Sequence, residues 1–122
     1  EDEAFAATAP APSASILDIV EKAKQYVDAH YTEELSLGAL ANRFAMDDAY
    51  LSRCFKQVAG CNLTLYVMRL RVAEAKRLLG EKRLSITEVA QAVGYDDYSY
   101  FSRVFKKLVG KSPRIYQEEE KP

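Results

Sequence analysis

Two short segments of this 122-residue chain carry the same set of charged and hydrogen-bonding side chains. The first segment reads YLSRCFKQVAG over 50–60, and the second reads YFSRVFKKLVG over 100–110. Arginine can bond the O6 and N7 atoms of guanine together, serine can contact several base edges, and lysine can reach a phosphate. A repeated set of this kind is typical of a surface that enters the major groove of DNA.

The apolar residues of each segment recur at i, i+3, i+4 and i+7, which predicts a helix with one buried face. The buried positions are Leu51, Cys54, Phe55 and Val58 in the first segment and Phe101, Val104, Phe105 and Leu108 in the second. The opposite faces present Ala49, Ser52, Arg53 and Lys56, and Ser99, Ser102, Arg103 and Lys106. A solvated helix face could also carry Arg and Lys, but recurrence of one polar set at matching positions favours binding. We expect the tyrosines to pack in the core, except Tyr98.

The two segments belong to a longer internal repeat. At an offset of 50, Tyr66 also repeats as Tyr116, whereas upstream the offset becomes 49. The upstream pairs are Leu35-Ser36 with Leu84-Ser85, Ala41 with Ala90, and Asp47-Asp48 with Asp96-Asp97. The change of offset predicts one extra residue in the second copy, between Asp97 and Tyr100.

Each copy has the pattern of a helix-turn-helix. Ala90 lies four residues before Gly94, so a small residue lets the two helices approach and a glycine accepts the positive φ of the turn. The first copy has Ala41 and Ala45 at the same spacing. We therefore expect some strain at Ala45.

The whole chain reads as all-α, with two helix-turn-helix subdomains, a long linker helix between them and about seven helices. Helices are expected at 16–30, 37–44, 48–58, 63–79, 86–93 and 97–108, with a short one after Ser112. The domain at 16–117 then divides into a first unit (16–60), a linker helix (62–80) and a second unit (84–117). Residues 1–15 read as a flexible linker or tail, and 118–122 as an acidic tail.

Charge and composition exclude several classes of protein. The net charge is −1, but six acidic residues lie at the two ends, and 16–117 holds 12 acidic and 16 basic residues. One histidine and no CxxC pair argue against a metal site, and we predict no catalytic residues and no cofactor. The longest apolar run is too short to span a membrane, and the two cysteines favour a cytoplasmic protein.

The expected linker helix of about 17 residues spans roughly 26 Å. With the flanking units, this places the two second helices, at about 48–58 and 97–108, near one DNA repeat of roughly 34 Å. We therefore expect the chain to read two successive major grooves. Because the two exposed faces differ, the site should be asymmetric.

The stretch ITEVAQAVGYDDYSYFSRVFKKLVGKSPRIY at 86–116 closely resembles the signature of AraC/XylS-type transcription regulators. The similarity extends over about 16–117, and LRVAEAKRLL at 70–79 is similar to the family's linker helix. The resemblance implies a DNA-binding domain of a bacterial transcription factor, usually an activator that contacts RNA polymerase. By position, it implies that Ala49, Ser52, Arg53, Tyr98, Ser99, Ser102 and Arg103 read bases and that Lys56 and Lys106 contact phosphates.

Sequence-specific binding of double-stranded DNA for transcriptional regulation is thus the leading hypothesis. The alternative is an interaction module whose basic faces dock an acidic partner such as an RNA polymerase subunit. We expect the chain to be the C-terminal output domain of a larger regulator and a monomer by itself. A sensor or dimerisation domain would then precede it.

Overall fold

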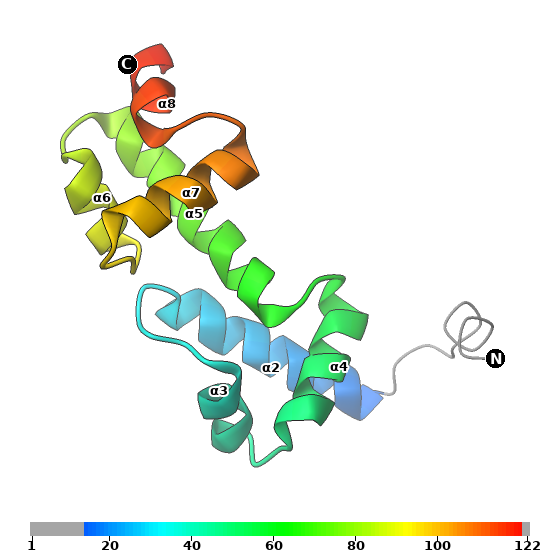
Figure 1. The fold of residues 1–122 in the computed structure, drawn as a ribbon. Coiled ribbons are helices and arrows are strands. Elements are labelled where there is room, and N and C mark those ends of the chain that lie inside the picture. The colour runs from blue at the N-terminus through cyan, green and yellow to red at the C-terminus, as the bar shows by residue number, and fades with distance from the viewer. Residues whose placement is uncertain (1–13, 121–122) are drawn as a thin grey trace.

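The computed structural model describes residues 14–120, and every regular element in this range is a helix (Figure 1). The elements are, in order, α2 (Ala14–His30), α3 (Leu37–Arg43), α4 (Asp48–Ala59), α5 (Leu63–Glu81), α6 (Ile86–Ala92), α7 (Tyr98–Val109) and α8 (Pro113–Glu119). The predicted all-α class is confirmed. Each expected helix is present, and no end differs from its expected position by more than two residues.

The first and last helices of the described range each include residues that the sequence had assigned to the tails. Helix α2 begins at Ala14, so it includes the last two residues of the segment predicted as a linker, and 1–13 lie outside the described residues. Helix α8 includes Glu118 and Glu119, which we had assigned to an acidic tail. Glu118 pairs with Arg114, and Glu119 pairs with Lys111. Residues 121–122 also lie outside the described part.

The helix caps repeat along with the sequence. Ser36 accepts a hydrogen bond from the backbone N–H of Ala39 at 3.0 Å, and Ser85 accepts one from Glu88 at 3.0 Å. The Glu88 carboxylate in turn accepts a bond from the Ser85 N–H at 2.8 Å, which completes a capping box. These caps fix the starts of α3 and α6 at matching points of the two units.

We predicted that the extra residue of the second copy lies between Asp97 and Tyr100, inside the helix. This prediction is wrong, because the extra residue lies in the turn before the helix. The N-caps of α4 and α7 are Asp47 and Asp97, which are 50 positions apart. The turn residues Met46 and Tyr95, 49 positions apart, make equivalent backbone bonds to Ala41 and Ala90, both at 2.8 Å. The insertion is therefore Asp96, between Tyr95 and the cap. The alignment at offset 49 matched both aspartates of each copy, but the cap bonds show that Asp47 and Asp97 are the equivalent pair.

The turn residues have the expected backbone geometry. Gly94 has a φ of +104° and Ala45 has a φ of +55°. An alanine in the left-handed region carries a steric penalty of roughly 1–2 kcal/mol. The prediction of strain at Ala45 thus agrees with its backbone conformation.

The buried residues form two separate clusters, one for each unit. The first joins α2, α3 and α4 to Val67 of α5, and the second joins α6 and α7 to Val72, Ala75 and Leu79 of the same helix. Helix α5 has 19 residues and thus contributes to both cores from its two halves (Figure 1). It is the common support of the two helix-turn-helix units.

Cys54 and Cys61 are both free and buried, and they make no disulfide. The part of the chain that the structure describes holds no group of three or more His, Cys, Asp or Glu side chains arranged to bind a metal ion. Within 14–120, none of the helices combines the length and apolar character needed to cross a bilayer.

Candidate nucleic-acid interface

Helices α4 and α7 expose the polar faces that the repeat predicted. Their apolar faces are buried through Leu51, Cys54 and Phe55, and through Phe101, Val104 and Phe105. Most of the predicted contact residues are exposed, namely Ala49, Arg53, Lys56, Tyr98, Ser99, Arg103 and Lys106. Ser52 and Ser102 are half-buried. The predicted residues thus gather into two surface strips, one on each helix.

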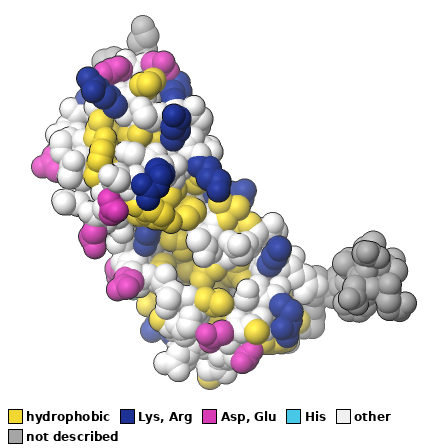
Figure 2. Space-filling view, in the orientation of Figure 1, with side chains coloured by type: hydrophobic (Ala, Val, Ile, Leu, Met, Phe, Trp, Pro, Cys, Tyr) yellow, Lys and Arg dark blue, Asp and Glu magenta, His cyan; other side chains and the backbone are white. Residues whose placement is uncertain are grey.

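The two strips lie on one side of the molecule. In the view of Figure 2, Lys and Arg side chains lie over α7 and over α4, on either side of an apolar patch. The patch includes a groove of about 220 Å³ between α5 and α7, lined by Leu65, Met68, Tyr100, Arg103, Val104, Lys107 and Leu108. One elongated ligand could therefore contact both helices at once.

Each strip holds its arginine over an aromatic ring. The guanidinium carbon of Arg53 lies 5.7 Å from the ring centroid of Tyr50, and that of Arg103 lies 5.7 Å from the ring of Tyr100. Cation–π contacts at this distance restrict a long flexible side chain before it meets a ligand. Repetition of the same pair at the same distance shows that both strips position arginine in the same way.

The two tyrosines are a part of the site that sequence reasoning missed. We expected them in the core, but Tyr50 is 40% exposed and Tyr100 is 39% exposed. The available signal was their i, i+3 spacing from Arg53 and Arg103, which places an aromatic and a cationic side chain on one helix face.

The two serines differ. The Oγ atom of Ser102 is buried and makes no hydrogen bond. A buried hydroxyl without a partner costs about 1–3 kcal/mol. Ser102 can contact a base edge only if its side chain rotates toward the surface.

The first turns of the two helices also differ in charge. Asp48 lies in the first turn of α4, whereas the first turn of α7 has no acidic residue. The last turn of α4 holds Lys56, and that of α7 holds both Lys106 and Lys107. Helix α7 is therefore the more positive of the two helices and suits a polyanion better.

Two helix-turn-helix units that expose arginine, lysine and small polar side chains along their second helices define a nucleic-acid-binding class of protein. Residues 40–119 match the family model described as "Helix-turn-helix domain". The chain belongs to this family, and its relatives show that it is of the AraC/XylS type, as the sequence resemblance implied.

Curated relatives are bacterial regulators. The chain is 36% identical over 97 residues to an uncharacterized helix-turn-helix transcriptional regulator, YisR, of Bacillus subtilis, covering 80% of this chain and 34% of that protein. It is 35% identical over 99 residues to the arabinose operon regulatory protein of Escherichia coli, covering 80% of this chain and 34% of the relative. The chain thus spans about a third of the length of these relatives.

Solved structures share the fold. The C-terminal domain of AraT, a response regulator from Geobacillus stearothermophilus, superposes with a TM-score of 0.80 at 38% identity, over 82% of this chain and 84% of that one. The DNA-binding domain of AdpA, described as a global transcriptional factor and solved with a target DNA, superposes with a TM-score of 0.77 at 25% identity. That match covers 81% of this chain and 89% of the AdpA chain.

Proposed function

We propose that this chain binds double-stranded DNA in a sequence-specific way and is the output domain of a larger bacterial transcription regulator. The matched strips on α4 and α7 carry the proposal, because each combines a ring-supported arginine with a lysine one turn further along. Relatives named as transcription regulators, and the AdpA domain solved with its target DNA, support the same function.

The proposed base-reading residues of the first strip are Ala49, Ser52 and Arg53, with Lys56 at a phosphate. In the second strip they are Tyr98, Ser99, Ser102 and Arg103, with Lys106 at a phosphate. Ser102 would act after rotation about χ1, since its hydroxyl is buried in the free protein. Two strips of different composition predict an asymmetric site that occupies successive major grooves.

We propose that residues 16–117 form the binding domain and act without a catalytic step, a metal or a cofactor. RNA polymerase is a proposed second partner, since one relative is named a transcriptional activator. The chain by itself would be a monomer that acts in the cytoplasm, where the bacterial chromosome lies. The relatives do not favour the interaction module that we considered as the alternative.

The first experiment is a selection of duplexes from random DNA with the purified chain at moderate salt. We expect one asymmetric motif with two half-elements about 10–11 base pairs apart. Enrichment of a single half-element would assign base reading to one strip alone. Binding without enrichment that disappears as salt rises would leave only phosphate attraction and contradict the proposal.

Substitution of Arg103 then separates base reading from charge. Arg103→Ala should cost about 1–3 kcal/mol of binding free energy on the selected site and relax the preference there. Arg103→Lys keeps the charge but not the bidentate geometry, so it should relax the preference almost as much. An equal loss on selected and random DNA would show that Arg103 contacts only phosphate.

A further inference from the structure

Arg71 of α5 connects the linker helix to the first unit through main-chain carbonyls. Its Nε donates to the carbonyl of Tyr31 at 2.6 Å, and its Nη2 donates to the carbonyl of Glu33 at 2.8 Å. Both carbonyls belong to the loop between α2 and α3. Two charge-assisted bonds from one planar guanidinium fix the direction of this loop as well as its distance from α5.

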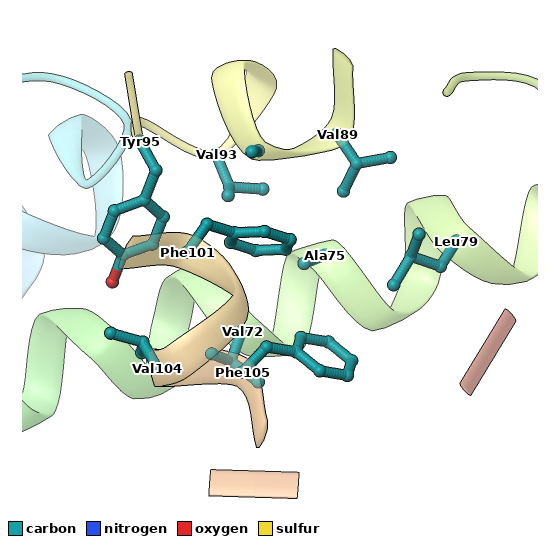
Figure 3. Packing of buried hydrophobic residues seen from close by; sticks show 10 residues of the cluster. Val72, Ala75, Leu79, Val89, Val93, Tyr95, Phe101, Val104 and Phe105 are labelled. Atoms are coloured by element: carbon teal, nitrogen blue, oxygen red, sulfur yellow. The ribbon is translucent and has the colours of Figure 1, made fainter. Parts of the chain in front are cut away.

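The same guanidinium contacts the second unit. Its carbon lies 4.9 Å from the ring centroid of Tyr95, the turn residue that precedes Asp96. Tyr95 is buried and packs against Phe101 and Tyr100 of α7. Figure 3 shows Tyr95 at the end of the second cluster, beside the ribbon of the first unit. Arg71 therefore lies between the loop of one unit and the turn of the other.

The two units also touch directly at Gly94. A Cβ at this position would lie 2.8 Å from the carbonyl oxygen of Thr32 and 3.1 Å from the guanidinium carbon of Arg71. Only a residue without a side chain allows this approach. We call Arg71, Gly94, Tyr95 and the loop 31–33 the Arg71 junction.

Within residues 14–120, the buried hydrophobic residues of the two units form separate clusters, and α5 contributes to both. The orientation of the units therefore depends on α5 and on contacts such as the Arg71 junction. The loop 31–33 leads from α2 into α3, the first helix of the first helix-turn-helix, and Tyr95 leads into α7. The Arg71 junction therefore joins the two units through the segments that enter the first helix-turn-helix and α7. Loss of the guanidinium would leave two carbonyls and a tyrosine ring without the group that joins them.

We propose that Arg71 is a positioning residue that holds α4 and α7 in one relative orientation and thereby sets the spacing between the two half-elements that the chain reads. This inference rests on the proposed function. One inserted base pair moves a half-element by about 3.4 Å along the DNA and rotates it by about 35°. A rigid pair of strips would not follow that change, whereas a loose pair would.

The test uses Arg71→Met, which keeps an unbranched side chain but removes the charge and the donors, and Arg71→Lys, which can bond one carbonyl. Arg69→Met is the matched control, because it removes one positive charge from the exposed side of the same helix. Affinity is measured on duplexes with the selected spacing, with one base pair added or removed, and with a single half-element.

For the wild-type chain and Arg69→Met we expect each change of spacing to weaken binding about tenfold or more. Arg71→Met should bind single half-elements within about twofold of the wild type, lose about tenfold at the selected spacing, and show a spacing penalty below about threefold. Arg71→Lys should fall between. Equal losses of Arg71→Met on all duplexes, or an unchanged spacing penalty, would overturn the inference.

A measurement without DNA separates this inference from the proposed function. Residual dipolar couplings of the free wild-type chain should fit one alignment tensor for both units, and those of Arg71→Met should need two. If the wild type shows no DNA preference, the proposed function fails while the couplings still decide the orientation. A single tensor for Arg71→Met would overturn the role of Arg71 by itself.

Discussion

The turns of the two helix-turn-helix units have the same backbone hydrogen bonds but different surroundings. In the first unit Ala45 is exposed, so a left-handed alanine costs only its own strain. In the second unit Gly94 faces the carbonyl of Thr32 at a distance that excludes any side chain. The first turn therefore connects only the helices of its own unit, whereas the second turn also contacts the other unit.

The recognition helices differ in a related way. Helix α4 begins with an acidic residue, Asp48, and its Ser52 has no buried unpaired hydroxyl of the kind found at Ser102. Helix α7 presents Tyr98 at the surface and ends with two lysines. The second unit thus has more positive charge for DNA, and it keeps one polar group without a partner.

The largest effect should come from truncation of the two cores. Phe55→Ala and Phe105→Ala should each lower the free energy of unfolding by about 3–5 kcal/mol, since both rings are fully buried. Urea titration measures the loss, and hydrogen exchange shows where it falls. Exchange should quicken in α2–α4 for the first variant and in α6–α8 for the second.

If either alanine variant fails to fold, Phe55→Leu and Phe105→Leu replace them, because leucine should lower the free energy of unfolding less. A uniform increase of exchange throughout the chain would show that the two clusters act as one core, and it would remove the basis for comparing separate units.

The turns offer the next largest difference. Gly94→Ala should cost about 2–3 kcal/mol, because positive φ and a clash with backbone act together. Gly60→Ala is the matched control, since Gly60 has a φ of +84° with nothing within 4 Å of its Cβ position, and it should cost only about 1 kcal/mol. Ala45→Gly should stabilise by about 0.5 kcal/mol. Thermal unfolding compares the three, and equal costs for both glycines would contradict the close contact.

Tyr66 and Tyr116 occupy equivalent positions of the repeat, and the stabilities of their variants at high pH provide a further comparison of the two units. Tyr66 lies edge-on to Phe55 and donates to Asp28 Oδ1 at 2.9 Å, while Tyr116 lies edge-on to Phe105. Burial, followed by the bond to Asp28, raises the pKa of Tyr66 to about 12. A raised pKa means that folding favours the neutral phenol, so its stabilisation is complete below about pH 10 and is lost as the pH rises toward 12.

Tyr66→Phe should therefore lose about 0.5–1 kcal/mol at pH 7 and show a shallower decline of stability above pH 10 than the wild type. Urea midpoints at pH 7 and pH 11 measure both. Lys76 and Lys111 lie near the ring of Tyr116. We therefore expect Tyr116→Phe to change the loss of stability at high pH less than Tyr66→Phe does. If the stability of Tyr66→Phe falls above pH 10 as steeply as that of the wild type, the bond to Asp28 does not stabilise the neutral phenol.

The smallest effect concerns the serines. Ser102→Ala removes a buried hydroxyl without a partner, so it should stabilise the free chain by about 0.5–1 kcal/mol more than Ser52→Ala does. If Ser102 rotates to contact a base, the same variant should also weaken binding to the selected DNA. A gain of stability with unchanged affinity would remove Ser102 from the proposed base-reading set.

Local rules allowed much of this fold to be predicted. Apolar spacing and cap residues located all seven helices within 14–120, and the repeat identified the outward faces of α4 and α7. The location of the inserted residue was wrong, because residue identity pairs Asp47 with Asp96, whereas the N-cap equivalent to Asp47 is Asp97. The exposure of Tyr50 and Tyr100 was missed, because a helical stripe alone does not show how far the core extends.

The class of fold, the two units and the polar set on each recognition helix all follow from the amino-acid sequence. These features depend on residues that are close along the chain, and helix periodicity and capping act over such short distances. The contacts of Arg71, the close approach at Gly94 and the burial of the Ser102 hydroxyl depend on how distant parts of the chain pack together. The partners of Arg71 are main-chain carbonyls 38 and 40 positions away, and since every residue has a carbonyl, no residue type marks them in the sequence.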